Sequence, residues 1–89
     1  MKPGDLVKVI RPNVLPGIEL GDLAILMEID WDHRNYPNGI TGFDGEAIRG
    51  RGYFFFPNKP EINATWGRGG RKLGPMLTFN NFEVIDETR

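Results

Sequence analysis

The chain has 89 residues with 12 acidic and 11 basic side chains and a formal net charge of −1, which leaves room for one domain spanning residues 1–89. It contains no cysteine and a single histidine, His33, which excludes disulfides, thiolate-bound zinc or iron–sulfur centres and a histidine-rich metal site. Twelve glycines and seven prolines indicate many turns, and a 39% hydrophobic content at near-zero net charge argues against disorder.

The first half of the chain holds two predicted strands separated by a loop. Residues 5–11 are rich in β-favouring side chains, and Pro12 ends the run because it cannot donate a ladder hydrogen bond. Residues 12–21 contain two prolines and two glycines and predict a long loop. Residues 23–30 form the second predicted strand, and both of its faces are apolar near its start. This pattern predicts a central position in the sheet.

The second half predicts further strands between longer loops. Residues 31–50 are rich in Asn, Gly, Asp and Pro and indicate a long loop with a short irregular strand near 40–43. Another loop spans residues 59–75, and Asn80-Asn81 forms a tight turn before the last strand. No helical period persists beyond one turn, so the fold class is predicted to be all-β. The five predicted strands are 5–11, 23–30, 51–56, 76–79 and 82–86.

Three segments of the chain resemble an SH3-like barrel. Residues 4–10 look like the first strand of many such barrels, residues 21–26 resemble the second strand after the long first loop, and residues 80–85 are similar to the closing turn and strand. The resemblance implies a single small SH3-like domain, a partly open five-stranded barrel with long loops.

Within that plan, residues 7–12 and 80–82 resemble the family of PsaE, an accessory subunit of photosystem I. Its kin include the ferredoxin–thioredoxin reductase variable chain and the nitrile hydratase β subunit, and small uncharacterised phage proteins also look similar. Residues 31–75 depart from the PsaE pattern because they are longer and richer in glycine. The docking role of that family is therefore not carried over to this chain, since a shared fold does not fix a function.

Alternation along the predicted strands gives a set of expected core residues. The aromatic run at 53–56 places two rings inward and two outward, and the sequence leaves open which pair faces out. An exposed pair would mark a contact surface, whereas long loops folded over it would make it part of the core. The predicted core residues are Val7, Val9, Ile25, Met27, Leu77, Phe82 and Val84.

Positive charge is concentrated in residues 49–72, which hold six basic residues against Glu61 alone. Aromatic rings interleave with these bases, and stackable rings beside Arg and Lys are typical of proteins that bind single-stranded nucleic acid. The alternative is that charge simply solvates flexible loops, which the sequence pI of about 5.7 favours. The six bases are Arg49, Arg51, Lys59, Arg68, Arg71 and Lys72.

The sequence gives little support to metal binding or catalysis. Glu28, Asp30 and Asp32 follow one another at alternate positions beside His33, and they would share a face in a regular strand. Carboxylates so placed could hold a hard cation such as Ca²⁺, but no calcium-loop spacing is present and no metal is expected. The chain lacks Ser as well as Cys, so no nucleophile–base pair is evident. We expect no catalytic residues, no cofactor and no enzyme activity.

The prediction for function is a non-catalytic interaction module that binds a protein partner or a second copy of itself through loop aromatics. A nucleic-acid-binding barrel that uses residues 49–72 is the alternative. Met1 opens onto Lys2-Pro3-Gly4 rather than a signal peptide, and no run of 18 apolar residues exists. We therefore expect a cytoplasmic protein, or one in a host cytoplasm or virion if phage-encoded. The candidate binding residues are Trp31, Tyr53, Phe55, Trp66, Arg68, Arg71 and Lys72.

Overall fold

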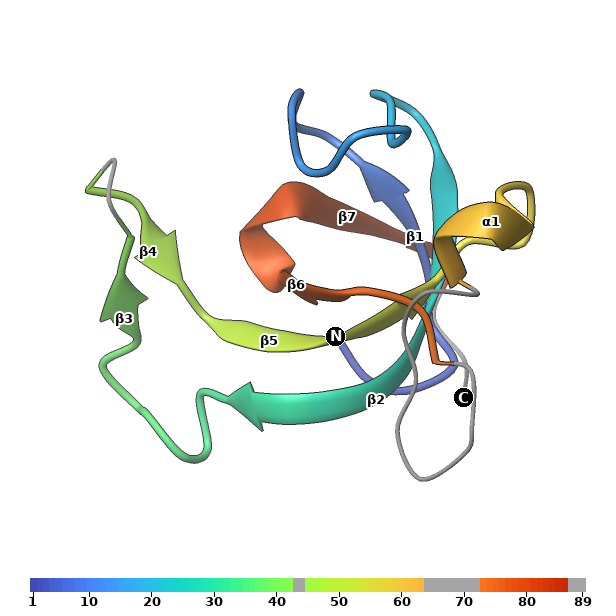
Figure 1. Cartoon of the computed structure of the whole chain (residues 1–89). Coiled ribbons are helices and arrows are strands. Elements are labelled where there is room, and N and C mark those ends of the chain that lie inside the picture. The colour runs from blue at the N-terminus through green and yellow to red at the C-terminus, as the bar shows by residue number, and fades with distance from the viewer. Residues whose placement is uncertain (43–44, 64–72, 87–89) are drawn as a thin grey trace.

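Strands make up most of the regular structure of the chain (Figure 1). The computed structural model describes residues 1–42, 45–63 and 73–86. The all-β fold class is confirmed, and neither helical element of these residues is long and apolar enough to cross a membrane. In chain order the elements are β1 (Leu6–Val9), β2 (Leu23–Asp32), β3 (Ile40–Thr41), β4 (Ala47–Ile48), β5 (Gly50–Phe55), the short helix α1 (Pro60–Asn63), β6 (Met76–Thr78), the 3₁₀ turn η1 (Phe79–Asn81) and β7 (Phe82–Asp86).

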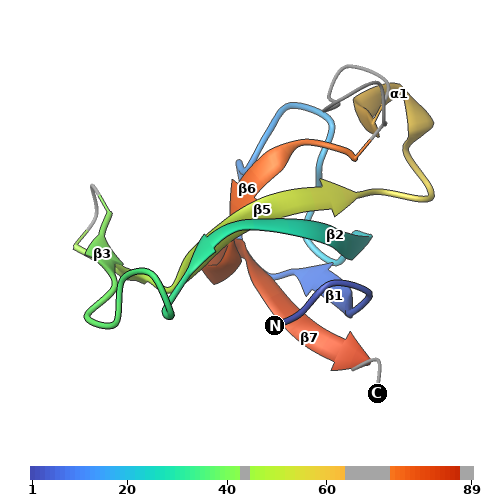
Figure 2. The same cartoon turned by 90° about the horizontal axis from the view of Figure 1, so that it is seen from below.

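The five predicted strands form one antiparallel sheet in the order β6-β5-β2-β1-β7. β2 takes the central position that its two apolar faces predicted. β6 and β7 lie at opposite edges of the sheet although only the three residues of η1 join them, so the sheet must bend until its two edges approach each other (Figure 2). The two edge strands do not pair, and the sheet is not closed into a barrel. The SH3-like plan thus stays a prediction.

A second, two-stranded sheet stands apart from the first. β3 pairs with β4 through Ile40 opposite Ile48 and Thr41 opposite Ala47, and this hairpin projects from one end of the main sheet in both ribbon views (Figures 1 and 2). We call residues 33–42 and 45–49 the arm. The predicted irregular strand near 40–43 is present as β3. β4 was missed because two residues are too few to show a period, and only pairing with β3 makes them a strand.

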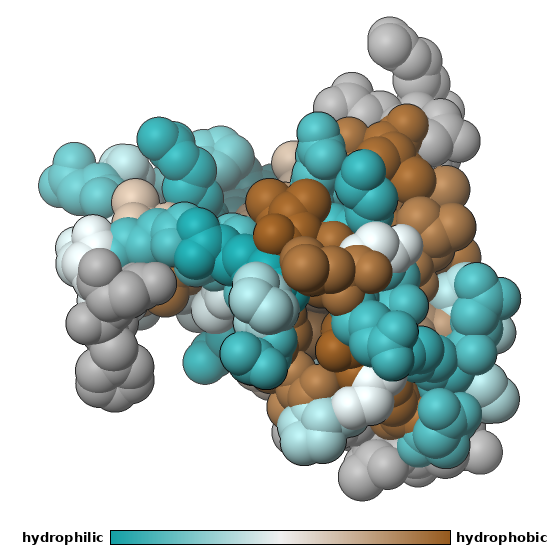
Figure 3. All heavy atoms as spheres, turned by 90° about the horizontal axis from the view of Figure 1, so that it is seen from above, coloured by the Kyte–Doolittle hydropathy of each residue, from teal (hydrophilic) through white to brown (hydrophobic). Residues whose placement is uncertain are grey.

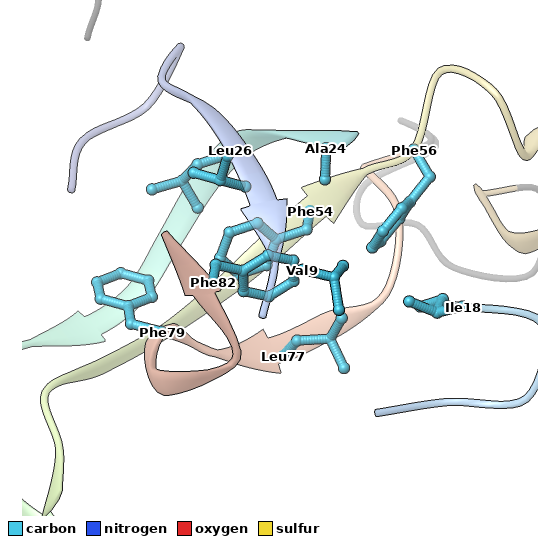
Figure 4. Close-up of a cluster of buried hydrophobic side chains, with 10 residues drawn as sticks. Val9, Ile18, Ala24, Leu26, Phe54, Phe56, Leu77, Phe79 and Phe82 are labelled. Atoms are coloured by element: carbon cyan, nitrogen blue, oxygen red, sulfur yellow. The ribbon is translucent and has the colours of Figure 1, made fainter. Parts of the chain in front are cut away.

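The hydrophobic core lies on one face of the five-stranded sheet, which we call the inner face. Phe54 of β5 and Phe56, the residue after the strand, are buried in it, and the Phe54 ring stacks on Phe82 with centroids 3.9 Å apart and planes 15° apart. Figure 4 shows these rings converging with Ile18, which comes from the loop between β1 and β2. Four predicted core residues are buried as expected, namely Val7, Val9, Leu77 and Phe82.

The predicted core face of β2 is wrong. Ala24 and Leu26 are fully buried, whereas Ile25 and Met27 are half-buried on the opposite side. The cause is the strand register: Val7 lies directly opposite Ala24, and residues directly opposite in an antiparallel pair have side chains on the same face. Because both faces of β2 are apolar, its sequence period alone could not choose between them. Val84, the last predicted core residue, is half-buried and packs against the core.

Candidate functional site

Alternation along β5 turns Arg51, Tyr53 and Phe55 to the face opposite the core. On its inner side β5 packs closely against the core, and Gly50 lies against the Phe79 ring. A Cβ on Gly50 would lie 2.5 Å from Cδ2 of the Phe79 ring, so no larger side chain fits beneath that ring. With the core side fixed in this way, Tyr53 and Phe55 are the outward pair of the aromatic run.

Cross-strand neighbours extend this surface over the sheet. Phe55 lies opposite Ile25, which in turn lies opposite Leu6 on β1. Tyr53 lies opposite Met76 on β6, and Arg51 lies opposite Trp31 on β2. Apart from the exposed Arg51, these residues are all half-buried, so they present an apolar surface that the described part of the chain covers only in part. One acidic residue, Glu28, lies among them opposite Tyr53. We call this surface the outer face: Leu6, Ile25, Glu28, Trp31, Arg51, Tyr53, Phe55 and Met76.

The structure therefore brings together the three candidate binding residues that it describes. Trp31 was expected in a loop, but β2 continues to Asp32, and pairing with β5 carries Trp31 onto the outer face. Trp66, Arg68, Arg71 and Lys72 lie outside the described residues. Sequence reasoning missed Leu6 and Met76 and assigned Ile25 to the core. The apolar residues on both faces of β2 were the sequence signal that this strand contributes to two surfaces, the core and the outer face.

Charged and polar residues flank the outer face at both ends. At the end near the arm, the Trp31 ring meets the half-exposed Tyr36 edge-on with centroids 5.3 Å apart, and Arg51 Nη2 donates to Asp30 Oδ2 at 2.7 Å. At the other end, Lys8 Nζ lies 3.8 Å from Glu83 Oε2. In the space-filling view the arm is mostly hydrophilic, whereas apolar and hydrophilic residues are interspersed over the rest of the face shown (Figure 3).

The three carboxylates at the end of β2 do not converge. Glu28 lies opposite Tyr53 on the outer face, whereas Asp32 lies opposite Gly50 on the inner face. Irregularities in the pairing after Leu26 and after Ile29 break the alternation on which a shared face depended. Within residues 1–42, 45–63 and 73–86, no three side chains of the His, Cys, Asp and Glu types lie close enough to hold a metal ion.

Asp32 instead fixes the conformation of the chain where the arm begins. Its side chain is only 5% exposed, and its oxygens accept hydrogen bonds from the backbone N–H of Arg34 at 2.9 Å and from the Arg34 guanidinium at 3.0 and 3.1 Å. These bonds, with that from the guanidinium as the largest cause, hold the pKa of Asp32 below its ordinary value. Asp32 therefore folds the chain locally and leaves the outer face to other residues.

Replacing this carboxylate should change how stability depends on pH. A group whose folded pKa is lowered stabilises the fold above its unfolded pKa of about 3.9 and loses that contribution as the pH falls through the folded pKa. We expect Asp32→Asn to lower the Tm at pH 7 and to reduce the further fall in Tm on acidification below about pH 4. Other carboxylates keep titrating, so the slope falls rather than vanishes. Thermal melts followed by circular dichroism measure both quantities.

The control for this prediction is Glu83→Gln. Its pair with Lys8 is long and solvent-exposed, and pairs of that kind contribute little to stability. This variant should keep the Tm and the acid slope of the parent chain. A parental slope in Asp32→Asn would contradict the role assigned to the carboxylate.

Comparison with known proteins does not assign this chain to a family. The chain matches no model of a protein family, no curated protein and no solved structure. The function must therefore be argued from the outer face and the arm themselves.

Proposed function

We propose that the chain is a non-catalytic interaction module whose outer face packs against a protein surface. The observation that carries this proposal is the gathering of Trp31, Tyr53 and Phe55 on one face of the sheet. Aromatic side chains that are partly open to solvent and lie among aliphatic neighbours are typical of protein-binding surfaces. Tyr and Trp in particular are over-represented among the residues that contribute most binding energy.

The strand order supports an SH3-like plan for this module. β1 lies between β2 and β7, and η1 links the two edge strands of a strongly bent sheet. Such small, bent, antiparallel sheets bury one face and leave the other available for contacts. In this plan one face of β2 packs in the core and the other lies on the outer face. Both faces of β2 are therefore apolar, which accounts for the position of the site.

A second copy of the chain is the partner that fits this face best. A two-fold interface is self-complementary, because each patch meets the same patch of the partner. The outer face meets that requirement. Its residues are apolar apart from Glu28 and Arg51, and an ion pair lies at either end, Arg51 with Asp30 and Lys8 with Glu83. In a symmetric pair the apolar residues can pack on one another while these ion pairs stay at the rim.

The described bases support the nucleic-acid alternative less well. Arg51 is held by Asp30 at 2.7 Å, and Lys59 by Asp22 at 2.8 Å. Phosphate binding would have to break these pairs or rely on other bases. Arg68, Arg71 and Lys72 lie outside the described residues, so this comparison covers only Arg49, Arg51 and Lys59. Aromatic packing against protein remains the function that the geometry favours.

Sedimentation velocity on the parent chain and on Tyr53→Thr/Phe55→Thr tests the proposal. Threonine keeps the β-favouring shape of the strand while it removes both rings. We expect the parent chain to shift from monomer to dimer between roughly 10 μM and 1 mM, and the double variant to stay monomeric over the same range. The loss should correspond to about 2 kcal/mol or more of association free energy, as for interfacial aromatic anchors.

Leu20→Thr is the matched control. Leu20 is 59% exposed and lies outside the outer face, so its loss removes exposed apolar surface without touching Tyr53 or Phe55. The control should dimerise like the parent chain. A parent chain that stays monomeric up to about 1 mM, or a double variant that dimerises equally well, contradicts the proposal. Binding to single-stranded DNA that weakens steeply with added salt would support the alternative function instead.

A further inference from the structure

A small hollow lies at the root of the arm, away from the aromatic rings of the outer face. It forms between the start of the arm after β2 and the returning segment around β4. A second hollow between the arm and η1 shares two of its residues, Ala47 and Arg49, and is otherwise lined by Phe79 and Asn80. The first hollow is lined by His33, Pro37, Asn38, Gly39, Ala47 and Arg49.

The three polar side chains that line this hollow can all donate hydrogen bonds. Arg49 offers a guanidinium fork that matches two oxygens of a carboxylate or phosphate group. Asn38 and His33 add an amide and an imidazole, which can also donate to an oxyanion. The other lining residues, a proline, a glycine and an alanine, bring no acidic side chain.

The charge balance around the hollow leaves Arg49 in surplus. Of the described acids in and beside the arm, Asp32 is bound by Arg34 and Glu46 by Arg11. In the parts of the chain that the structure describes, Arg49 itself makes no ion pair and no side-chain hydrogen bond. The hollow therefore combines a cation that pairs with no acid among residues 1–42, 45–63 and 73–86 with lining residues that carry no negative charge.

We infer that this hollow binds a single oxyanion group, the carboxylate or phosphate of a ligand, with Arg49 as its charged anchor. Two charge-assisted hydrogen bonds from the guanidinium would position the group, and Asn38 and His33 would donate from the opposite wall. The site is separate from the aromatic contact proposed above. Either proposal can be wrong while the other is right, because Tyr53 and Phe55 do not line the hollow.

Chemical-shift titration of the ¹⁵N-labelled chain tests the inference with inorganic phosphate and, separately, with acetate. Sodium chloride at equal ionic strength serves as the reference. We expect saturable shifts confined to the side-chain signals of His33, Asn38 and Arg49 and the amide of Ala47, with an apparent Kd of about 1–10 mM. Saturation by phosphate alone assigns the site to phosphate groups, and saturation by acetate extends it to carboxylates.

Arg49→Gln should weaken this binding about tenfold or more, because it removes the charged donor. Lys59→Gln is the control: it removes a positive charge outside both the hollow and the outer face, from a side chain already held by Asp22 at 2.8 Å, and should bind like the parent chain. Shifts that are absent, that do not saturate, or that spread over all basic residues overturn the inference. Equal weakening in both variants overturns it as well. The parent titration decides these points even if one variant fails to fold.

Discussion

Phe54→Ala should cost about 3–5 kcal/mol of unfolding free energy, the usual range for removing a large ring from a packed core. Phe54 is fully buried. Its ring stacks on Phe82 at 3.9 Å and meets Phe79 edge-on at 6.1 Å, so truncation leaves a cavity between two other rings. Urea denaturation measures the loss. Small domains have total stabilities of about 5–15 kcal/mol, so Phe54→Leu, with an expected loss of about 1–2 kcal/mol, provides a milder version.

The neighbouring residue supplies a matched control. Phe55→Ala removes the same ring from the next position of β5, but from the half-buried outer face. Its cost should be about 1–2 kcal/mol, because less surface leaves water at that position. An equal loss at the two positions, or a larger loss at Phe55, would show that the inner and outer faces have been exchanged.

Gly74→Ala should destabilise the chain by about 2–4 kcal/mol. Gly74 has a φ of +88°, a conformation that costs any residue with a Cβ. A Cβ at this position would overlap the carbonyl oxygen of Phe54 and lie 2.7 Å from its carbonyl carbon. The backbone would have to move, and the hydrogen bond from Phe54 N to Pro75 O, now 2.9 Å, would lengthen. Urea denaturation again measures the effect.

Gly21→Ala separates backbone strain from steric overlap. Gly21 has nearly the same φ, +86°, but a Cβ there would have nothing within 4 Å. This variant should lose only about 1 kcal/mol, the cost of a positive φ alone. If Gly74→Ala and Gly21→Ala lose equal amounts, the close approach of Gly74 to β5 contributes nothing and the prediction is wrong.

Local sequence pattern predicted the five strands of the main sheet, because each is a short run of β-favouring residues bounded by Gly, Pro or Asn. The ends of the strands depend on pairing with neighbouring strands, so they were predicted less accurately. β2 runs two residues further than expected, to Asp32, because β5 continues opposite it as far as Gly50. The hairpin of β3 and β4 forms through contacts between residues six and eight positions apart, which alternation within either segment cannot reveal.

The candidate site was predictable in part. The sequence narrowed the outward rings of β5 to two alternatives, and the glycine at position 50 held the decisive signal. A glycine three residues before a bulky run marks a place where another ring, here Phe79, lies against the strand. That position shares its face with Phe54 and leaves Tyr53 and Phe55 outward. The surplus charge of Arg49 was not predictable, because it depends on which acids pair with Arg34 and Arg11 in space.

The two edges of the main sheet, which pair with no other strand among the described residues, bear on aggregation of the chain. An open sheet edge can recruit further strands and so start aggregation. The edges here are short, three residues in β6 and five in β7, and β7 carries the exposed Glu83. Short edges with a charge offer little template for fibril growth. The open sheet can thus avoid edge-to-edge aggregation at the concentrations at which the proposed self-association is measured.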